Sequence, residues 1–172
     1  CEYWYEQTSK DFSCRLGKIV DIWNAAELNQ KLPIVPDVLP TAQAANRSKI
    51  VVISEEHVIE LGDPISIEPS GLAKGYIIDK AMGILRRELP QATGIKLDIG
   101  GDTSYWGAPP NQDGWQVNVA DPSAIADNGG FITTLSLNSM AIATSGHTSR
   151  TRKFGIREFS HILDTNRGWP IA

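Results

Sequence analysis

Apolar residues follow two patterns along the chain: a helical spacing of about 3.6 residues in two segments, and short β-rich runs elsewhere. The first helical spacing, expected over residues 18–31 and closed by Pro33, has apolar positions at Ile19, Ile22, Trp23 and Ala26. The second begins after Gly71 and stops before Pro90, with one face made of Ile77, Ile78, Ala81, Met82, Leu85 and Leu89. Two amphipathic helices are therefore predicted.

Short runs rich in β-branched residues predict strands. They cover residues 50–53, 58–61, 65–68, 95–99, 115–119, 132–137 and 140–143. Tight turns separate the first three runs, which favours antiparallel pairing. Residues 33–48 are rich in Pro, Ala and polar residues, so we expect a surface connection that can include a short helix from Pro40. The predicted fold class is α+β, with helices packed on a mixed, largely antiparallel sheet.

Composition narrows the classes of function. The chain has 172 residues, and 16 Lys and Arg against 20 Asp and Glu give a net charge of −4. No basic stripe is present, so no nucleic-acid partner is expected. No apolar run reaches the length of a membrane-spanning helix. Of the cysteines, Cys1 and Cys14, one disulfide is conceivable, but their spacing does not decide it.

The segment from Glu68 to Gly75 passes from a strand through a small-residue loop into a helix. The N–H groups and positive dipole of a helix start suit a phosphate, and Lys74 could add a cation. The alternative is an ordinary loop that Ser70 caps. The segment contains neither a Gly-Lys-[Ser/Thr] phosphate loop nor a dinucleotide fingerprint.

A glycine pair lies between two carboxylates at the end of a predicted strand. Gly100 and Gly101 would let a ligand approach the backbone, while Asp98 and Asp102 could bind ribose hydroxyls, an adenine amine or a metal. The alternative is a turn that needs positive φ and carries solvated aspartates.

Two later segments carry further polar groups. Thr144, Ser145 and Arg150 could hold phosphate oxygens, or could belong to a solvated loop; His147 beside Ser145 lacks the G-x-S-x-G context of a serine hydrolase. His161 could act as an acid, a base or a phosphate ligand, or could be a structural histidine in a strand. No metal-ligand pattern such as H-E-x-x-H or paired C-x-x-C occurs.

Taken in their order, these segments resemble the ApbE family of flavin transferases. The resemblance extends from residue 12 to residue 170 and is carried by residues 12–23, 70–79, 98–102, 115, 119–122, 143–146, 150, 160–164 and 168–170. It implies an α+β fold that binds FAD in a cleft. It also implies Mg²⁺-dependent transfer of FMN from FAD to a threonine in a target motif of an acceptor flavoprotein, with release of AMP. Some relatives resemble FAD pyrophosphatases instead, and a flavin-binding module without turnover is a third reading.

The resemblance also assigns roles to residues. His161 is expected near the reacting group as a catalytic residue, and Gly71 is expected to offer its backbone carbonyl to Mg²⁺, with the remaining ligands outside this chain. FAD is expected to contact Asp11, Phe12, Ser13, Glu68, Lys74, Asp98, Gly100, Gly101, Asp102, Thr144, Ser145, Arg150 and Ile162.

Departures from the family pattern define further expectations. Residues 1–172 are expected to form a single partial domain, without the family's N-terminal strands and without its C-terminal Asp-x-x-x-Thr segment. Ser13 replaces the commoner Asp, and Glu68 with Pro69 replaces Asp-Leu. We expect the isolated chain to bind Mg²⁺ and FAD weakly.

The resemblance also bears on location. Family members are commonly exported lipoproteins, which implies a periplasmic protein, anchored at the inner membrane or free, with a cytoplasmic form as the alternative. Cys1 is not expected to be the lipid anchor, because it lies where the family is already in mid-domain. Any anchor would lie outside this chain.

Overall fold

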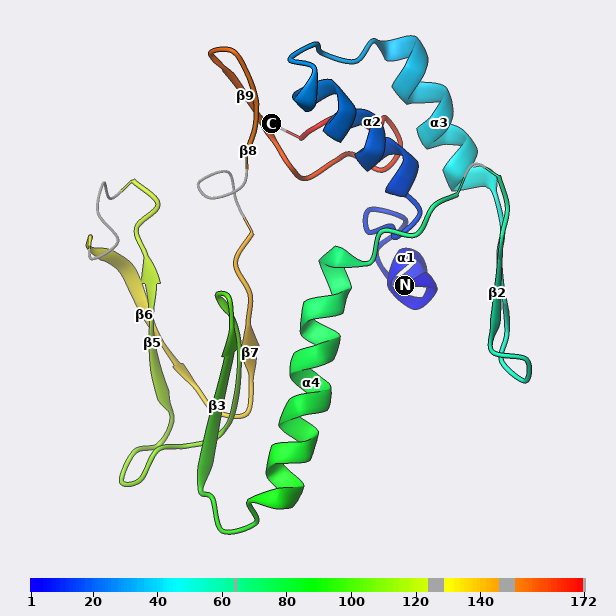
Figure 1. Ribbon diagram of the computed structural model, residues 1–172. Coiled ribbons are helices and arrows are strands. Elements are labelled where there is room, and N and C mark those ends of the chain that lie inside the picture. Colours follow the sequence, from blue (N-terminus) through cyan, green and yellow to red (C-terminus); the bar gives the residue numbers. More distant parts are fainter. Residues whose placement is uncertain (64, 124–128, 146–150, 172) are drawn as a thin grey trace. The chain divides into compact units, whose positions relative to one another are not determined.

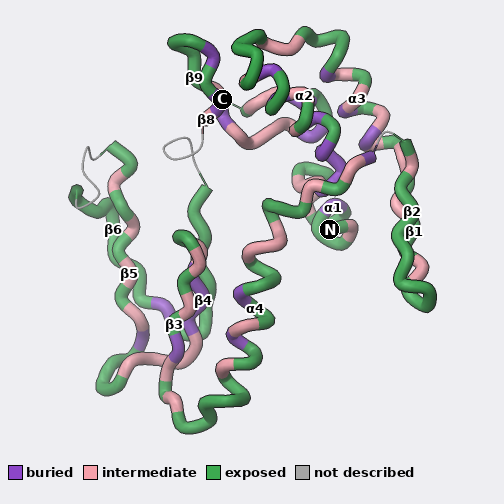
Figure 2. The backbone as a smooth tube through the Cα atoms, in the orientation of Figure 1, coloured by how far each residue is buried: buried purple, intermediate pink, exposed green. Residues whose placement is uncertain are grey.

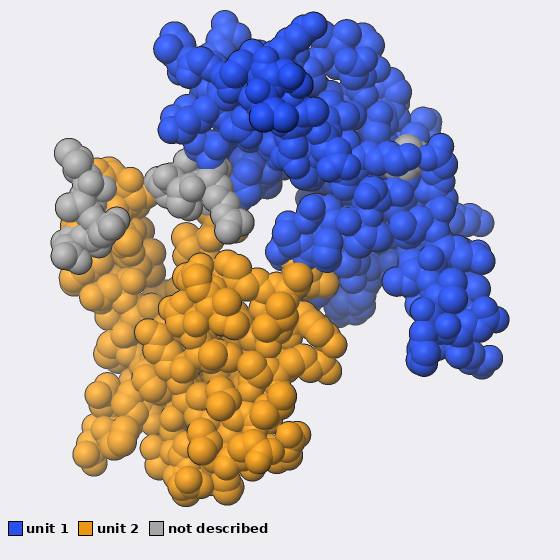
Figure 3. All heavy atoms as spheres, viewed as in Figure 1, with its two compact units in different colours: residues 1–71, 146–172 blue, residues 72–145 orange. Residues whose placement is uncertain are grey.

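The computed structural model describes residues 1–63, 65–123, 129–145 and 151–171 (Figure 1). The chain forms two compact units: unit 1 comprises Cys1–Gly71 and Gly146–Ala172, and unit 2 comprises Leu72–Ser145 (Figure 3). That residues 1–172 form a single partial domain stays a prediction. The elements are α1 (Glu2–Gln7), α2 (Gly17–Leu28), α3 (Val35–Arg47), β1 (Ile50–Ile53), β2 (Val58–Leu61), α4 (Ser70–Glu88), β3 (Gly94–Ile99), β4 (Asp102–Gly107), β5 (Trp115–Ala120), β6 (Phe131–Leu137), β7 (Ala141–Ile142), β8 (Thr151–Phe154) and β9 (Arg157–Ser160).

The core of unit 1 lies between α2, α3 and the segment around β8 and β9. Ile19 and Trp23 of α2 and Val38 of α3 are each 0% exposed. Trp23 packs edge-on against Trp169 and Phe154, and its indole Nε1 donates to the carbonyl of Gly168 at 2.8 Å. The helical spacing predicted for α2 is thus confirmed, and Figure 2 shows the buried stretches of α2 and α3.

The prediction for residues 33–48 was wrong. They hold α3, a helix of 13 residues that contains Pro40, instead of a connection with a short helix from Pro40. A proline inside a helix removes one backbone hydrogen bond. Burial of Val38, Ala42 and Ala45, none more than 1% exposed, compensates for that loss. Packing against α2 is a tertiary effect that local composition does not report.

The strands β1 and β2 pair antiparallel, with Ile50 opposite Leu61, as predicted. The third run, residues 65–68, is not a strand of this hairpin. Ser66 instead makes an isolated parallel bridge with Leu16, and the N–H of Gly17 donates to the Ser66 carbonyl at 2.9 Å. The partner lies 50 residues away in sequence, so the local strand pattern could not reveal it.

Unit 2 contains α4 from Leu72 onward and two antiparallel sheets. The first sheet has the order β3-β4-β7, and the second pairs β5 with β6 (Figure 1). These elements confirm the predicted helix and the strand runs after it, whereas β4 was missed, as were β8 and β9 of unit 1. In α4, Ile78 and Met82 are buried while Ile77 of the predicted face is exposed, and Leu89, also exposed, lies just after the helix ends. No helix in the described ranges has an apolar stretch long enough to cross a membrane.

Candidate functional site

The predicted site residues fall into two sets, one in each unit. Unit 1 contains Asp11, Phe12, Ser13, Glu68, Gly71, His161 and Ile162; unit 2 contains Lys74, Asp98, Gly100, Gly101, Asp102, Thr144 and Ser145. Arg150 and His147 lie outside the described residues. The geometry of each set is given within its own unit.

The turn between β3 and β4 is organised by the side chain of Asp98. One carboxylate oxygen accepts the N–H of Gly101 at 3.1 Å, and the other accepts the hydroxyl of Thr103 at 2.9 Å. The hydrogen bond from Gly101, followed by that from Thr103, lowers the pKa of Asp98 below its usual value. Gly100 and Gly101 have φ of 57° and 90°, so the turn does need positive φ. Asp98 is therefore an ionised residue that holds the glycine pair in shape.

Lys74 joins the first turns of α4 to this glycine turn. Its Nζ lies 3.3 Å from a carboxylate oxygen of Asp102 and donates to the Gly100 carbonyl at 3.4 Å. Both side chains of the ion pair are partly exposed, which leaves the ammonium group within reach of a ligand. The structure thus brings four predicted residues, Lys74, Gly100, Gly101 and Asp102, to one place in unit 2.

A cavity of about 550 Å³ adjoins this turn, between the two sheets of unit 2. Its lining includes three predicted residues, Asp98, Gly101 and Thr144. Ser145 follows Thr144 in an exposed position and is not among the lining residues. The remaining lining residues are Lys96, Thr103, Tyr105, Trp115, Gln116, Val117, Asn118, Val119, Ala120 and Ile142.

The cavity combines aromatic rings with hydrogen-bonding groups. The rings of Tyr105 and Trp115 lie 5.7 Å apart, and the Trp115 indole Nε1 donates to the Gly107 carbonyl at 3.0 Å, which fixes its orientation. Its volume lies within the usual range for small-molecule sites. Rings, hydroxyls and amides around such a space suit a flat, polar heterocycle and its sugar. Sequence reasoning missed Tyr105 and Thr103, although a glycine pair after a strand could have signalled a hairpin and hence β4.

In unit 1, the predicted residues Glu68 and Gly71, just before and in the first turn of α4, contact the segment around Phe12. The N–H of Glu68 donates to the Cys14 carbonyl at 2.8 Å, and a Cβ on Gly71 would lie 3.3 Å from Cε2 of Phe12. Glu68 Oε1 accepts the N–H of Ser70 at 3.0 Å, so Glu68, rather than Ser70, provides the side-chain cap of α4. An anion at this helix end would compete with the Glu68 carboxylate. The phosphate at the first turn of α4 stays a prediction.

The other predicted residues of unit 1 lie in two loops. Asp11 is exposed, and the Ser13 hydroxyl oxygen accepts the N–H of Arg15 at 3.2 Å. His161 is half-buried and follows the last residue of β9, so it is not within a strand. The N–H of Ile162 donates to the Ser160 hydroxyl oxygen at 3.1 Å, and its carbonyl accepts the N–H of Ile171 at 3.0 Å. The roles of these residues stay predictions.

The described residues offer no group of three or more His, Cys, Asp or Glu side chains that could hold a metal ion. Gly71 lies in the first turn of α4, and its carbonyl is one oxygen of the kind that Mg²⁺ accepts. One backbone carbonyl does not make a magnesium site, because Mg²⁺ demands near-octahedral oxygen coordination that includes carboxylates. The side chains in the described part of the chain therefore do not fit the predicted metal.

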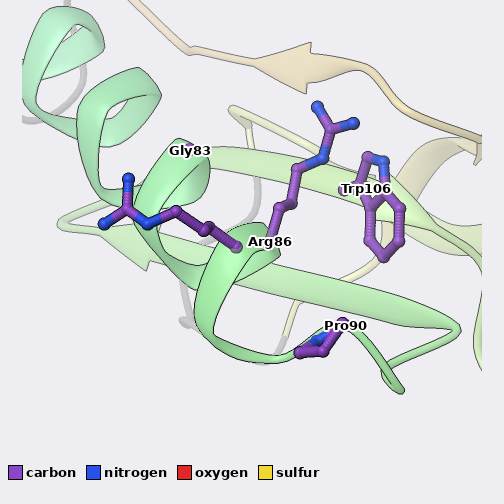
Figure 4. Close-up of a pocket in the computed structure, with 5 residues that line it drawn as sticks. Gly83, Arg86, Pro90 and Trp106 are labelled. Carbon is purple, nitrogen blue, oxygen red and sulfur yellow. The ribbon is translucent and has the colours of Figure 1, made fainter.

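A second hollow of about 470 Å³ lies at the end of α4 and contains none of the predicted residues. It is lined by Gly83, Arg86, Arg87, Pro90 and Trp106 (Figure 4). The Arg86 guanidinium lies 4.9 Å from the centre of the Trp106 ring. Arginines in the last turn of a helix also stabilise its negative end, so a structural role accounts for them.

Comparison with known proteins gives consistent results. The ApbE family model matches residues 1–172. The chain is 23% identical over 161 residues to the FAD:protein FMN transferase of Klebsiella pneumoniae, which covers 93% of this chain and 48% of that protein. It is 29% identical over 169 residues to the FAD:protein FMN transferase of Vibrio cholerae, which covers 91% of this chain and 46% of that protein. The chain thus spans about half the length of these curated relatives.

Solved structures agree on the fold. An ApbE protein from Thermotoga maritima matches with a TM-score of 0.82 at 24% identity, over 96% of this chain and 53% of that one. The apo flavinyl transferase ApbE of Pseudomonas stutzeri matches with a TM-score of 0.72 at 17% identity, over 97% of this chain and 50% of that one. The predicted α+β class with antiparallel sheets is thereby confirmed. On the match of its whole length to the family model, the chain belongs to the ApbE family.

Proposed function

We propose that this protein acts in the transfer of FMN from FAD to a threonine of an acceptor protein, with release of AMP. The observation that carries the proposal is the convergence in unit 2, where Lys74 pairs with Asp102 and where Asp98, Gly101 and Thr144 line one cavity with two aromatic rings. The names of the curated relatives support the same reaction class.

The proposed chemistry is a phosphoryl transfer. The threonine oxygen forms a bond to the phosphorus of the FMN half, the bond from that phosphorus to the bridging oxygen breaks, and AMP leaves with the electron pair. His161 is proposed to take the threonine proton, since an imidazole nitrogen can accept a proton from a hydroxyl. Lys74 is proposed to offset the negative charge of the phosphates.

Mg²⁺ dependence is part of the proposal, with Gly71 offering its carbonyl, but no step is routed through the metal because the described side chains do not fit it. We also propose an oxidising location such as the periplasm. The bond between Cys1 Sγ and Cys14 Sγ supports it, because disulfides persist in oxidising compartments.

The test is a transfer assay. The protein is incubated with FAD, Mg²⁺ and an acceptor that carries the threonine motif, and AMP is measured together with the mass of the acceptor. We expect stoichiometric AMP and FMN-modified acceptor. AMP with free FMN would indicate hydrolysis of FAD instead, and FAD binding without AMP would indicate a binding module.

A pair of histidine variants tests the role of His161. His161→Asn is expected to reduce the rate by about 10²-fold or more, because general acid-base groups contribute on that scale. His57→Asn is the matched control, since His57 lies in the exposed β1-β2 turn at a φ of 54° that asparagine tolerates. Equal rates in the two variants would exclude His161 from the proton transfer.

A further inference from the structure

The first fourteen residues form a loop that a disulfide closes. Cys1 and Cys14 are joined through their sulfur atoms, and the loop contains α1 together with Asp11, Phe12 and Ser13. Cys1 is exposed, whereas Cys14 is 1% exposed. We refer to residues 1–14 as the N-terminal loop. All three of its predicted flavin contacts lie between α1 and the disulfide.

Within the N-terminal loop, the backbone reverses through two unusual residues. Ser9 and Lys10 have φ of 51° and 75°, a region that residues other than glycine enter at a cost. The turn is held by α1: the N–H of Lys10 donates to the Tyr5 carbonyl at 2.8 Å, and the N–H of Phe12 donates to the Thr8 hydroxyl oxygen at 2.9 Å. The backbone position of Phe12 therefore depends on the position of α1.

Two attachments keep α1 in place. One is the disulfide at Cys1, immediately before the helix. The other is Arg15, which is buried, forms an ion pair with Glu2, and has its guanidinium carbon 4.2 Å from the centre of the Tyr5 ring. The Arg15 Nη1 also donates to the Ser48 carbonyl at 2.7 Å. The helix has only six residues, which is too short to persist without such attachments.

The N-terminal loop also contacts the two other predicted segments of unit 1. Phe12 lies against Gly71, and the Cys14 carbonyl accepts the N–H of Glu68 at 2.8 Å. The hydroxyl of the buried Thr165, four residues after His161, donates to the Lys10 carbonyl at 2.8 Å. A displacement of the N-terminal loop would therefore also disturb the segment from Glu68 to Gly71 and the segment from His161 to Thr165.

We propose that the Cys1–Cys14 disulfide positions Phe12 and Ser13 for FAD, so that its reduction weakens FAD binding. This inference rests on the proposed function of the site. In the reduction, a dithiol supplies two electrons and two protons, the sulfur-sulfur bond breaks, two cysteine thiols form, and the reductant closes to its own disulfide. Cys14 then keeps its buried place, while Cys1 and α1 lose the covalent link to Cys14.

The test compares FAD affinity in three forms of the protein, by titration of flavin fluorescence. They are the oxidised protein, the same protein reduced with dithiothreitol, and Cys1→Ser, which removes the disulfide but leaves the buried Cys14 side chain. We expect the dissociation constant of FAD to rise about tenfold in the last two, as it would if one molecule in ten kept the competent loop. Dithiothreitol should have no further effect on Cys1→Ser.

A control separates positioning from general stability. Val38→Ala removes a fully buried side chain from the core of the same unit and leaves the N-terminal loop unchanged. At a temperature where every form is folded by circular dichroism, Val38→Ala should keep the FAD affinity of the oxidised protein within about twofold. An equal affinity in oxidised and reduced protein, or the same loss in Val38→Ala, would overturn the proposal.

Hydrogen exchange gives a readout that does not need FAD. The amides of Lys10 and Phe12 should exchange at least about tenfold faster after reduction, because their acceptors lie on α1 and just beyond it. If the oxidised protein binds no FAD, the proposed function fails, and exchange at these two amides still decides whether the disulfide positions the loop. Unchanged exchange at both amides would refute the positioning role.

Discussion

The two units differ in how they use apolar side chains. In unit 1, α2 and α3 enclose Ile19, Trp23 and Val38 completely, and aromatic rings from distant segments complete that core. In unit 2, β6 is exposed along its length except at Leu137, and the buried residues of β4 include two hydroxyls, Thr103 and Ser104. Unit 1 is organised around a hydrophobic cluster, whereas unit 2 is organised around strands that leave a cavity with both polar and apolar lining.

This difference indicates where stability and binding reside. Close packing makes a core intolerant of lost volume, so substitutions in the cluster of unit 1 should affect folding. A cavity lined by hydroxyls, amides and carboxylates buries less apolar surface and leaves groups for a ligand. Substitutions around the Asp98 turn should therefore affect binding more than folding.

The largest expected effect is on the free energy of unfolding, and it is tested by replacing one tryptophan in each unit. Trp23→Ala should lower the free energy of unfolding of unit 1 by about 3–5 kcal/mol, because it leaves a cavity and an unpaired Gly168 carbonyl. Trp106→Ala should cost unit 2 about 1–2 kcal/mol, since that ring is only half-buried and packs on Arg86.

The measurement is amide exchange of α2 and of β3, which reports opening of each unit separately. Trp4→Ala provides a control, because that ring is 47% exposed, and it should change stability by less than about 0.5 kcal/mol. Equal losses for Trp23 and Trp106 would contradict the contrast between the units.

A smaller effect, on binding, is expected at Lys74. Lys74→Met removes the partner of Asp102 and should weaken FAD binding about tenfold, while stability changes by less than about 1 kcal/mol because the ion pair is partly exposed. Calorimetric titration with FAD and thermal unfolding measure the two quantities. Lys80→Met is the matched control on the same helix, where the ammonium lies over the Tyr76 ring. A loss of stability without a loss of affinity would place Lys74 in the fold alone.

The smallest effect concerns the titration of Asp98. Hydrogen bonds from Gly101 and Thr103 lower its pKa below 3.8, so they favour the charged form in the folded state. Their contribution to stability is therefore present above pH 3.8 and is lost as the pH falls through the lowered pKa. Carbon-detected NMR titration should show this pKa, and Thr103→Val should raise it.

The same titration contains an internal reference. Hydrogen bonds from Ser123 also lower the pKa of Asp121, and this value should be the same in Thr103→Val. A native Asp98 pKa at or above 3.8 would show that the carboxylate does not hold the glycine turn.

The elements that were predicted correctly are those whose local spacing of apolar residues matches their secondary structure. In α2, the residues Ile19, Trp23 and Ala26 repeat at the helical period, and all three are buried. In β3 and β5, short β-rich runs bounded by turns became strands. By contrast, α3 contains Pro40, and its stability comes from packing on α2, which local composition does not report.

Part of the candidate site could also be predicted. One glycine pair, its flanking carboxylates and Lys74 were identified from motifs, and the structure brings Lys74, Gly100 and Asp102 together. Tyr105 was missed because β4 has only three β-forming residues, Thr103, Tyr105 and Trp106, and directly follows the glycine pair. One alternative for the start of α4 had Ser70 as its cap, whereas Glu68 provides the side-chain cap, because composition does not say which side chain will reach the first N–H groups.

The sequence by itself determined the helical and strand periods, the order of the motifs and, through them, the family. Only the tertiary structure decided which distant residues meet. It joined Cys1 to Cys14, paired Ser66 with Leu16 and placed Trp115 beside Tyr105 at the cavity. The physical reason is that local spacing reflects backbone geometry over a few residues, whereas these contacts depend on chain closure and packing between segments far apart in sequence.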